Sequence, residues 1–157
     1  MITAERKPLE ELIEYIRPFD RILLVGCNEC VTVCAADGRK EVGLLASSLQ
    51  MASLKSGRPL DIKEMTLERQ CDPEYVEELL PVIDGVDAVM SMACGCGVQE
   101  VGRRFKATPV FPALNTTFMG ASERQGVWVE RCRGCGDCLI GITGGICPIV
   151  RCSKQLL

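Results

Sequence analysis

Hydrophobic residues in the first part of the chain follow helical spacing in some segments and form short uninterrupted runs in others. Between residues 8 and 17 the apolar positions recur at i, i+3, i+4 and i+7, which predicts an amphipathic helix with the face Leu9, Leu12, Ile13 and Ile16. Residues 22–25 form an apolar run without helical spacing, which predicts a buried parallel strand that ends at Cys27. After the next loop we expect Asp37 to cap a helix that ends at Gly57 and Pro59. The buried face of this helix is expected to be Val42, Leu45, Ala46, Leu49 and Ala52.

The alternation of strand and helix then recurs. Residues 60–68 and 88–93 predict the next two strands, and the second of them leads into Cys94 and Cys96. Asp72 and Pro73 open the helix between these strands. The apolar faces of this helix and of the helix after Cys96 are Val76, Leu79 and Leu80, and Val98, Val101, Gly102 and Phe105, respectively.

A fourth strand is predicted over residues 108–114, at the edge of the sheet because Pro109 and Pro112 cannot donate ladder hydrogen bonds. Alternating strands and helices predict an α/β fold, a short parallel sheet with flanking helices of the Rossmann or flavodoxin type. We expect this domain to span residues 1–120, followed by a cysteine-rich iron-sulfur segment over residues 121–157. The first and third predicted strands can flank the topological switch point, where such sheets bind ligands.

The amino-acid composition excludes several classes of function. The chain has 11 cysteines, no histidine, 47% hydrophobic residues and a net charge of −3. Without histidine the common catalytic triads are excluded, and the charge gives no case for nucleic acid. No G-x-G-x-x-G or Walker motif follows the first strand. With no signal peptide and no run of about 20 apolar residues, we expect a cytoplasmic protein without a membrane span, in which clustered thiols hold metal rather than form disulfides.

Two cysteine groups lie where the predicted strands end. Cys27, Cys30 and Cys34 occur in GCNECVTVC after the first strand, and Cys94 and Cys96 occur in ACGCG after the third. Because both strand ends can border the switch point, we expect these thiols to meet across it and hold a 4Fe-4S cluster. Zinc can occupy four of the same five thiolates and remains the alternative.

The C-terminal cysteines form a separate run, C-x2-C-x2-C-x8-C-P, made of Cys132, Cys135, Cys138 and Cys147 and followed by Cys152. Three cysteines at two-residue gaps and a distant Cys-Pro are closer to the ferredoxin pattern than to the separated pairs of a zinc ribbon. The run predicts a second 4Fe-4S cluster, with zinc as the alternative. Cys71, which stands apart in the sequence just before Asp72, is interpreted as a helix-entry residue rather than a ligand.

Three segments in the same order resemble the MetV family, the methylenetetrahydrofolate reductase C-terminal-type domain: GCNECVTVCAADGRKEV, ACGCGVQEVG and ERCRGCGDCLIGITGGICPIVRCSKQLL. The resemblance implies a small subunit of a MetVF-type methylenetetrahydrofolate reductase of acetogens and related anaerobes, in the one-carbon chemistry of the Wood-Ljungdahl pathway. It implies a relay of electrons from ferredoxin or another iron-sulfur carrier to the flavin, FMN, of a large catalytic subunit. A zinc-stabilised structural subunit of the same reductase is the alternative.

Carried onto this chain, the resemblance implies two ligand sets and no catalytic residue. The first is Cys27, Cys30 and Cys34 with Cys94 or Cys96, and the second is Cys132, Cys135 and Cys138 with Cys147 or Cys152. Family members commonly continue past the SKxLL segment with a glycine- and cysteine-containing tail, whereas this sequence stops at Leu157.

Overall fold

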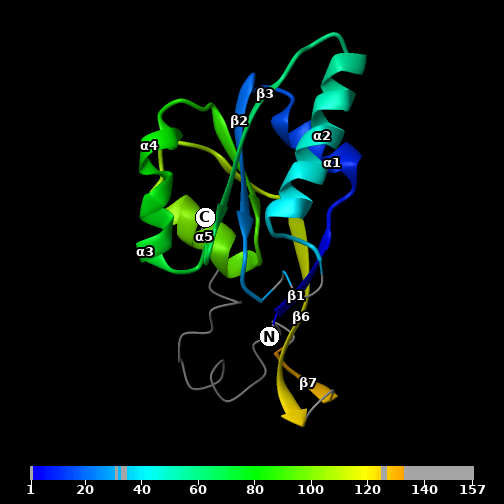
Figure 1. The fold of residues 1–157 in the computed structure, drawn as a ribbon, viewed down its shortest axis with the longest axis vertical. Coiled ribbons are helices and arrows are strands. Elements are labelled where there is room, and N and C mark those ends of the chain that lie inside the picture. The colour runs from blue at the N-terminus through cyan, green and yellow to red at the C-terminus, as the bar shows by residue number, and fades with distance from the viewer. Residues whose placement is uncertain (1, 31, 33–34, 125–126, 133–157) are drawn as a thin grey trace.

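A computed structural model describes residues 2–30, 32, 35–124 and 127–132, which form two sheets and their helices (Figure 1). The larger sheet contains β2 (Arg21–Cys27), β3 (Asp61–Leu67), β4 (Ala88–Met92) and β5 (Val110–Pro112). All of its strand pairs are parallel, in the order β3-β2-β4-β5. This order confirms the predicted parallel sheet and the position of β5 at its edge.

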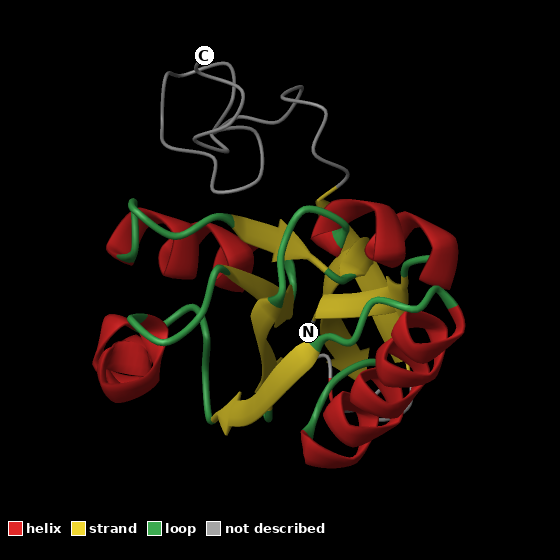
Figure 2. Cartoon of the chain, turned by 90° about the horizontal axis from the view of Figure 1, so that it is seen from above, coloured by secondary structure: helices red, strands yellow, loops and turns green. Residues whose placement is uncertain are grey.

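Helices cover both faces of this sheet, as Figure 2 shows from above. On one face α1 (Leu9–Ile16) and α2 (Arg39–Lys55) pack against β2 and β4. On the other face lie α3 (Pro73–Val76), the 3-10 turn η2 (Glu77–Leu79), α4 (Leu80–Ile83) and α5 (Gly95–Arg104). Buried apolar side chains fill both layers, and this burial is the main stabilising contribution to the fold. The predicted α/β architecture is therefore confirmed for the described part of the chain.

The connections between the strands create a topological switch point between β2 and β4. From β2 it crosses through α2 to β3 on one side, then returns over β2 to β4 on the other. The carboxyl ends of β2 and β4 therefore diverge into loops on opposite faces of the sheet. Gly26, near the end of β2, allows α2 to approach closely, because a Cβ there would lie 2.5 Å from Val42 Cγ2.

A second sheet lies outside the sequence-based prediction. It is antiparallel, in the order β1-β6-β7, and consists of β1 (Ile2–Arg6), β6 (Leu114–Arg124) and β7 (Val127–Cys132). In Figure 1 it extends below the α/β core from the end of β5. β1 has only five residues and most of β6 consists of polar and small residues, so neither carries the apolar run that marks β2 in the sequence. β6 runs continuously across residue 120, and the division there into two domains stays a prediction.

Two details of the predicted helices are wrong. Gly38, with a φ of 100°, occupies the cap position of α2, and Asp37 is buried instead. The helix opened by Asp72 is not continuous, because Pro81 has no N–H to donate to the preceding turn. Leu80 is consequently turned outward and 45% exposed.

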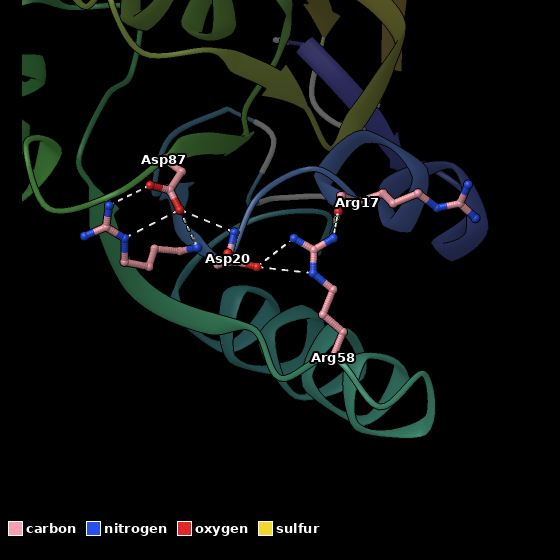
Figure 3. Close-up of polar contacts among 5 residues, drawn as sticks. Arg17, Asp20, Arg58 and Asp87 are labelled. Atoms are coloured by element: carbon pink, nitrogen blue, oxygen red, sulfur yellow. Dashed lines mark hydrogen bonds and ion pairs between the residues drawn. The ribbon is translucent and has the colours of Figure 1, made fainter.

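The amino ends of the strands are held by surface ion pairs (Figure 3). Asp87 accepts hydrogen bonds from the backbone N–H of Arg21 at 2.9 Å and from its guanidinium at 2.7 Å. Arg58 binds Asp20 at 2.7 Å and also donates to the carbonyl of Arg17. These contacts lie at the end of the sheet opposite the cysteines.

Candidate functional site

The carboxyl ends of three adjacent strands carry five cysteines. Cys27 is the last residue of β2 and is followed by Cys30, Cys71 follows β3, and Cys94 caps α5 after β4, two residues before Cys96. β2 is hydrogen-bonded to both β3 and β4, so its end lies between theirs. The expected meeting of the first two cysteine groups at the switch point is consistent with this arrangement, since the charge of Cys94 reaches both Cys27 and Cys30.

Among the five cysteines at the strand ends, Cys94 is the one whose pKa is lowered. It is buried at the first turn of α5, where a hydrogen bond from the Cys96 thiol lowers its pKa to about 6 against the effect of burial. The backbone N–H groups of Gly97 and Cys96 act in the same direction. The same hydrogen bond, with burial, raises the pKa of Cys96. The interaction within this pair therefore favours the thiolate of Cys94 over that of Cys96.

The pKa of Cys27, in contrast, is raised. Burial raises its pKa to about 11, and its Sγ donates to the carbonyl oxygen of Glu68 at 3.8 Å. Burial also raises the pKa of Cys30, and the charge of Cys94 adds to this effect. In the metal-free chain these side chains are neutral thiols, and a metal that binds them must displace their protons.

Asp37, which the sequence suggested only as a helix cap, is a buried acid beside this group. Its Oδ1 lies 2.7 Å from the hydroxyl of Thr32, which is itself 2.8 Å from the carbonyl oxygen of Cys27. The Thr32 hydroxyl is the donor in both contacts, so its one proton is shared between the Cys27 carbonyl oxygen and Asp37 Oδ1. Burial raises the pKa of Asp37 to about 7 despite the Thr32 hydrogen bond, and the charges of Cys94 and Glu41 add to the rise. No partner for Asp37 Oδ2 is present in the described part of the chain.

A buried amide ties the three strands together just below the cysteines. Gln70 is fully buried; its Nε2 donates to the carbonyl of Val25 at 2.9 Å and its Oε1 accepts from Ser91 at 2.6 Å. Gly97 packs directly on it, because a Cβ at Gly97 would lie 2.9 Å from Gln70 Cβ. Sequence reasoning missed Gln70. In the sequence, only its position next to Cys71 sets Gln70 apart, because the surrounding segment has the composition of a polar loop.

Several expected ligands lie outside the described residues: Cys34, Cys135, Cys138, Cys147 and Cys152. Cys132 is the last residue of β7, and its backbone pairs with Met119. Neither ligand set that was expected from the sequence is therefore complete here, and both stay predictions.

The residue types at the strand ends are those that zinc or an iron-sulfur cluster would require, because cysteine thiolates are ligands of both. As the side chains stand, no three Cys, Asp or Glu residues within the described ranges are close enough to hold a metal ion together. In the same part of the chain, no helix is both long and apolar enough to cross a membrane.

A groove also opens beside the site, along α5 and β5, with a volume of about 890 Å³. Val98, Val110 and Phe111 line its apolar part, and Arg103 and Lys106 are among the side chains at its rim. On the opposite face of the sheet, α2 exposes Leu44, Met51 and Leu54. Both surfaces thus carry apolar side chains that the packing of the α/β core does not bury.

Comparison with known families finds a match for the C-terminal part of the chain. Residues 111–157, from β5 through the C-terminal cysteine run, match the family described as "Methylene-tetrahydrofolate reductase C terminal". Neither the curated proteins nor the solved structures contain a significant match to the chain. The C-terminal part of this protein is thus similar to the C-terminal domain of methylenetetrahydrofolate reductases.

Proposed function

We propose that this chain is an iron-sulfur electron-transfer subunit of a methylenetetrahydrofolate reductase of the MetVF type. It passes electrons from an external donor, ferredoxin or another iron-sulfur carrier, to the flavin of a catalytic large subunit. The observation that carries the proposal is the gathering of five cysteines at the carboxyl ends of β2, β3 and β4. The reaction in this proposal is inferred from the similarity of residues 111–157 to a methylenetetrahydrofolate reductase domain.

The described residues support a binding role. Hydrogen bonds at the start of α5 lower the pKa of Cys94, and the packing of Gln70 and Gly97 keeps the surrounding loops in place. Cys27 and Cys94 are each only 5% exposed, so a group bound here is shielded from water on its protein side. Shielding and thiolate orientation are what the protein contributes to the potential of an iron-sulfur site.

A bound 4Fe-4S cluster supplies one-electron exchange, which a flavin can accept stepwise although folate reduction needs an electron pair. The chain itself needs no folate site and no catalytic residue for this role. The second cluster of the proposal belongs to Cys132, Cys135 and Cys138 with Cys147 or Cys152, within the segment that matches the reductase domain. The apolar surface of α2 is available for a partner subunit.

The first test is anaerobic purification followed by iron, acid-labile sulfide and zinc analysis and by EPR of the reduced protein. We expect iron and sulfide in equal amounts and a reduced-cluster EPR signal. Zinc without sulfide would refute the relay and support the alternative, a zinc-stabilised structural subunit.

The second test is electron transfer. The cluster-loaded chain is mixed with the flavin-containing large subunit and a low-potential donor, and flavin reduction is followed by absorbance. The variant Cys135→Ser serves as the comparison, because it removes one expected ligand of the C-terminal site. Equal rates of flavin reduction with and without the chain would contradict a relay.

A further inference from the structure

The groove along α5 and β5 has no role in the proposed function. Its volume of about 890 Å³ is in the range of pockets that bind small molecules and cofactors. One wall follows α5 from Gly95 to Arg103, a length of about 15 Å. The other wall is the edge strand β5 with the first residues of β6. The groove is therefore large enough for a molecule of two or three rings.

Gly102 keeps the groove open. It lies on the side of α5 that lines the groove, yet a Cβ there would meet no atom nearer than Val110 Cβ, at 4.0 Å. A glycine inside a helix costs about 1 kcal/mol relative to alanine. Packing against a neighbour does not require this glycine, so the space beside it is available to a ligand.

The apolar residues of the groove are recessed. Val110 and Phe111 are half-buried, and the ring of Phe111 is held by stacking on Tyr15 with 5.5 Å between the ring centroids. On α2, in contrast, Met51 is 63% and Leu54 is 70% exposed. A recessed apolar floor of this kind accommodates a flat ring, whereas protruding side chains are typical of a surface that meets another protein.

The edge of the sheet in this groove is poorly suited to an added strand. β5 has only three residues, Val110–Pro112, and both Pro109 and Pro112 lack an N–H to donate. A peptide that extends a sheet is held by main-chain hydrogen bonds, and the prolines remove donors for them. An occupant of the groove is therefore held by apolar contacts and by charge.

The groove is lined by cations, although the chain as a whole has a net charge of −3. Its described lining includes Lys7, Arg103 and Lys106 but no aspartate or glutamate. Lys7 is paired with Glu11, and Arg103 is paired with Glu100 through two of its three guanidinium nitrogens. Lys106 has no ion pair within the described ranges. The third nitrogen of Arg103 and the ammonium of Lys106 are thus available to an anionic group.

We propose that the groove between α5 and β5 binds a small aromatic anion, a ring system that carries a phosphate or carboxylate group. The rings lie against Val110 and Phe111, and the anionic group is bound by Lys106 and Arg103. The inference is independent of the metal centres of the proposed function. Binding forms and breaks no covalent bond.

The test uses two fluorescent dyes with the purified full chain. Anilinonaphthalene sulfonate is an aromatic anion, and phenylnaphthylamine has the same rings without the sulfonate. Lys106→Ala should weaken the binding of the anionic dye by about two- to fivefold, the contribution of an exposed ion pair, and leave the neutral dye unaffected. Gly102→Leu places a side chain in the groove without a clash and should remove most of the fluorescence of both dyes.

Lys55→Ala is the matched control. Lys55 is exposed at the end of α2, close in sequence to the exposed Met51 and Leu54, so it reports dye that binds on that apolar surface. It should alter the binding of neither dye. Circular dichroism of each variant confirms that it is folded, as expected for Gly102→Leu because leucine favours a helix over glycine.

Equal effects of Lys106→Ala and Lys55→Ala, or undiminished binding of both dyes by Gly102→Leu, would overturn the inference. Absence of dye binding by the wild type would also overturn it. Weaker association of Gly102→Leu with the flavin-containing large subunit would then identify the groove as a protein interface. Iron and sulfide contents do not enter these measurements, so the proposed function stands or fails separately.

The type of anionic group is determined by displacement of the bound anionic dye. Displacement by adenosine monophosphate indicates a phosphate, and displacement by indole acetate indicates a carboxylate. Adenosine and indole are the uncharged controls and should displace the dye more weakly. If neither anion displaces the dye, the groove does not recognise this class of ligand and the inference fails.

Discussion

Replacing Asp37 by Asn tests whether this buried carboxyl is held in its neutral form. The pKa of Asp37 is about 7 in the folded chain against an ordinary value of 3.8, first because of burial. A difference of about 3 in pKa corresponds to about 4 kcal/mol between the two protonation states. Because the folded chain binds this proton more tightly than the unfolded chain, its stability falls as the pH rises from about 4 to about 7 and levels off above.

Asparagine has nearly the same shape as a protonated aspartic acid but does not titrate. Urea unfolding of the metal-free wild type and of Asp37→Asn, between about pH 4.5 and pH 8, measures the difference. We expect the free energy of unfolding of Asp37→Asn to rise relative to that of the wild type by about 3 kcal/mol across this interval, which begins just above the unfolded pKa. The slope m should be equal in both proteins, so that the comparison reports stability alone.

Glu41→Gln provides a matched control, because the charge of Glu41 contributes to the raised pKa of Asp37 only after burial and the charge of Cys94. Glu41→Gln should slightly reduce the change of the unfolding free energy with pH. Asp37→Asn should remove the contribution of Asp37 to that change completely. If wild type and Asp37→Asn show parallel stability curves over the whole interval, Asp37 does not carry a raised pKa and the reasoning fails.

Further substitutions test the packing near the site and, as a comparison, an ion pair at the opposite end of the sheet, all by urea unfolding. Gly26→Ala places a Cβ 2.5 Å from Val42 Cγ2 and should cost about 1–3 kcal/mol; an unchanged midpoint would show that α2 can move away freely. Gln70→Ala leaves its buried partners on β2 and β4 without a hydrogen bond and should cost about 2–4 kcal/mol. Combining it with Ser91→Ala should cost less than the sum of the single changes. Arg58→Ala removes an exposed ion pair and should change stability by less than about 1 kcal/mol, and a larger loss would contradict a surface role.

The core elements could be predicted because each carries its own periodic signal. The apolar run of β2 and the helical spacing of α1, α2 and α5 reflect burial on one side of the element, so α1, for example, was expected within a residue or two of its bounds. β1, β6 and β7 were missed for the converse reason. They form a separate sheet in which β1 pairs with β6 from the other end of the described chain, and an apolar run as long as that of β2 does not occur in them.

The candidate site was predictable in part. A cysteine directly after a buried strand belongs at the carboxyl edge of a parallel sheet, and this placed Cys27, Cys30, Cys94 and Cys96 in one region. The roles of Gln70 and Asp37 were not predictable, because each depends on partners more than 20 residues away or on burial by another element.

The sequence by itself determined the type of the main sheet, because the strand-helix alternation specifies a parallel sheet, and eleven cysteines without a histidine predict thiolate-bound metal. Only the tertiary structure decided how the described thiols differ. Hydrogen bonds at the start of α5 lower the pKa of Cys94, burial raises the pKa of Cys27, and Cys71 lies at the same end of the sheet because β3 pairs with β2. The physical reason is that pKa values and ligand geometry depend on distances through space, which strand order sets and spacing along the chain does not.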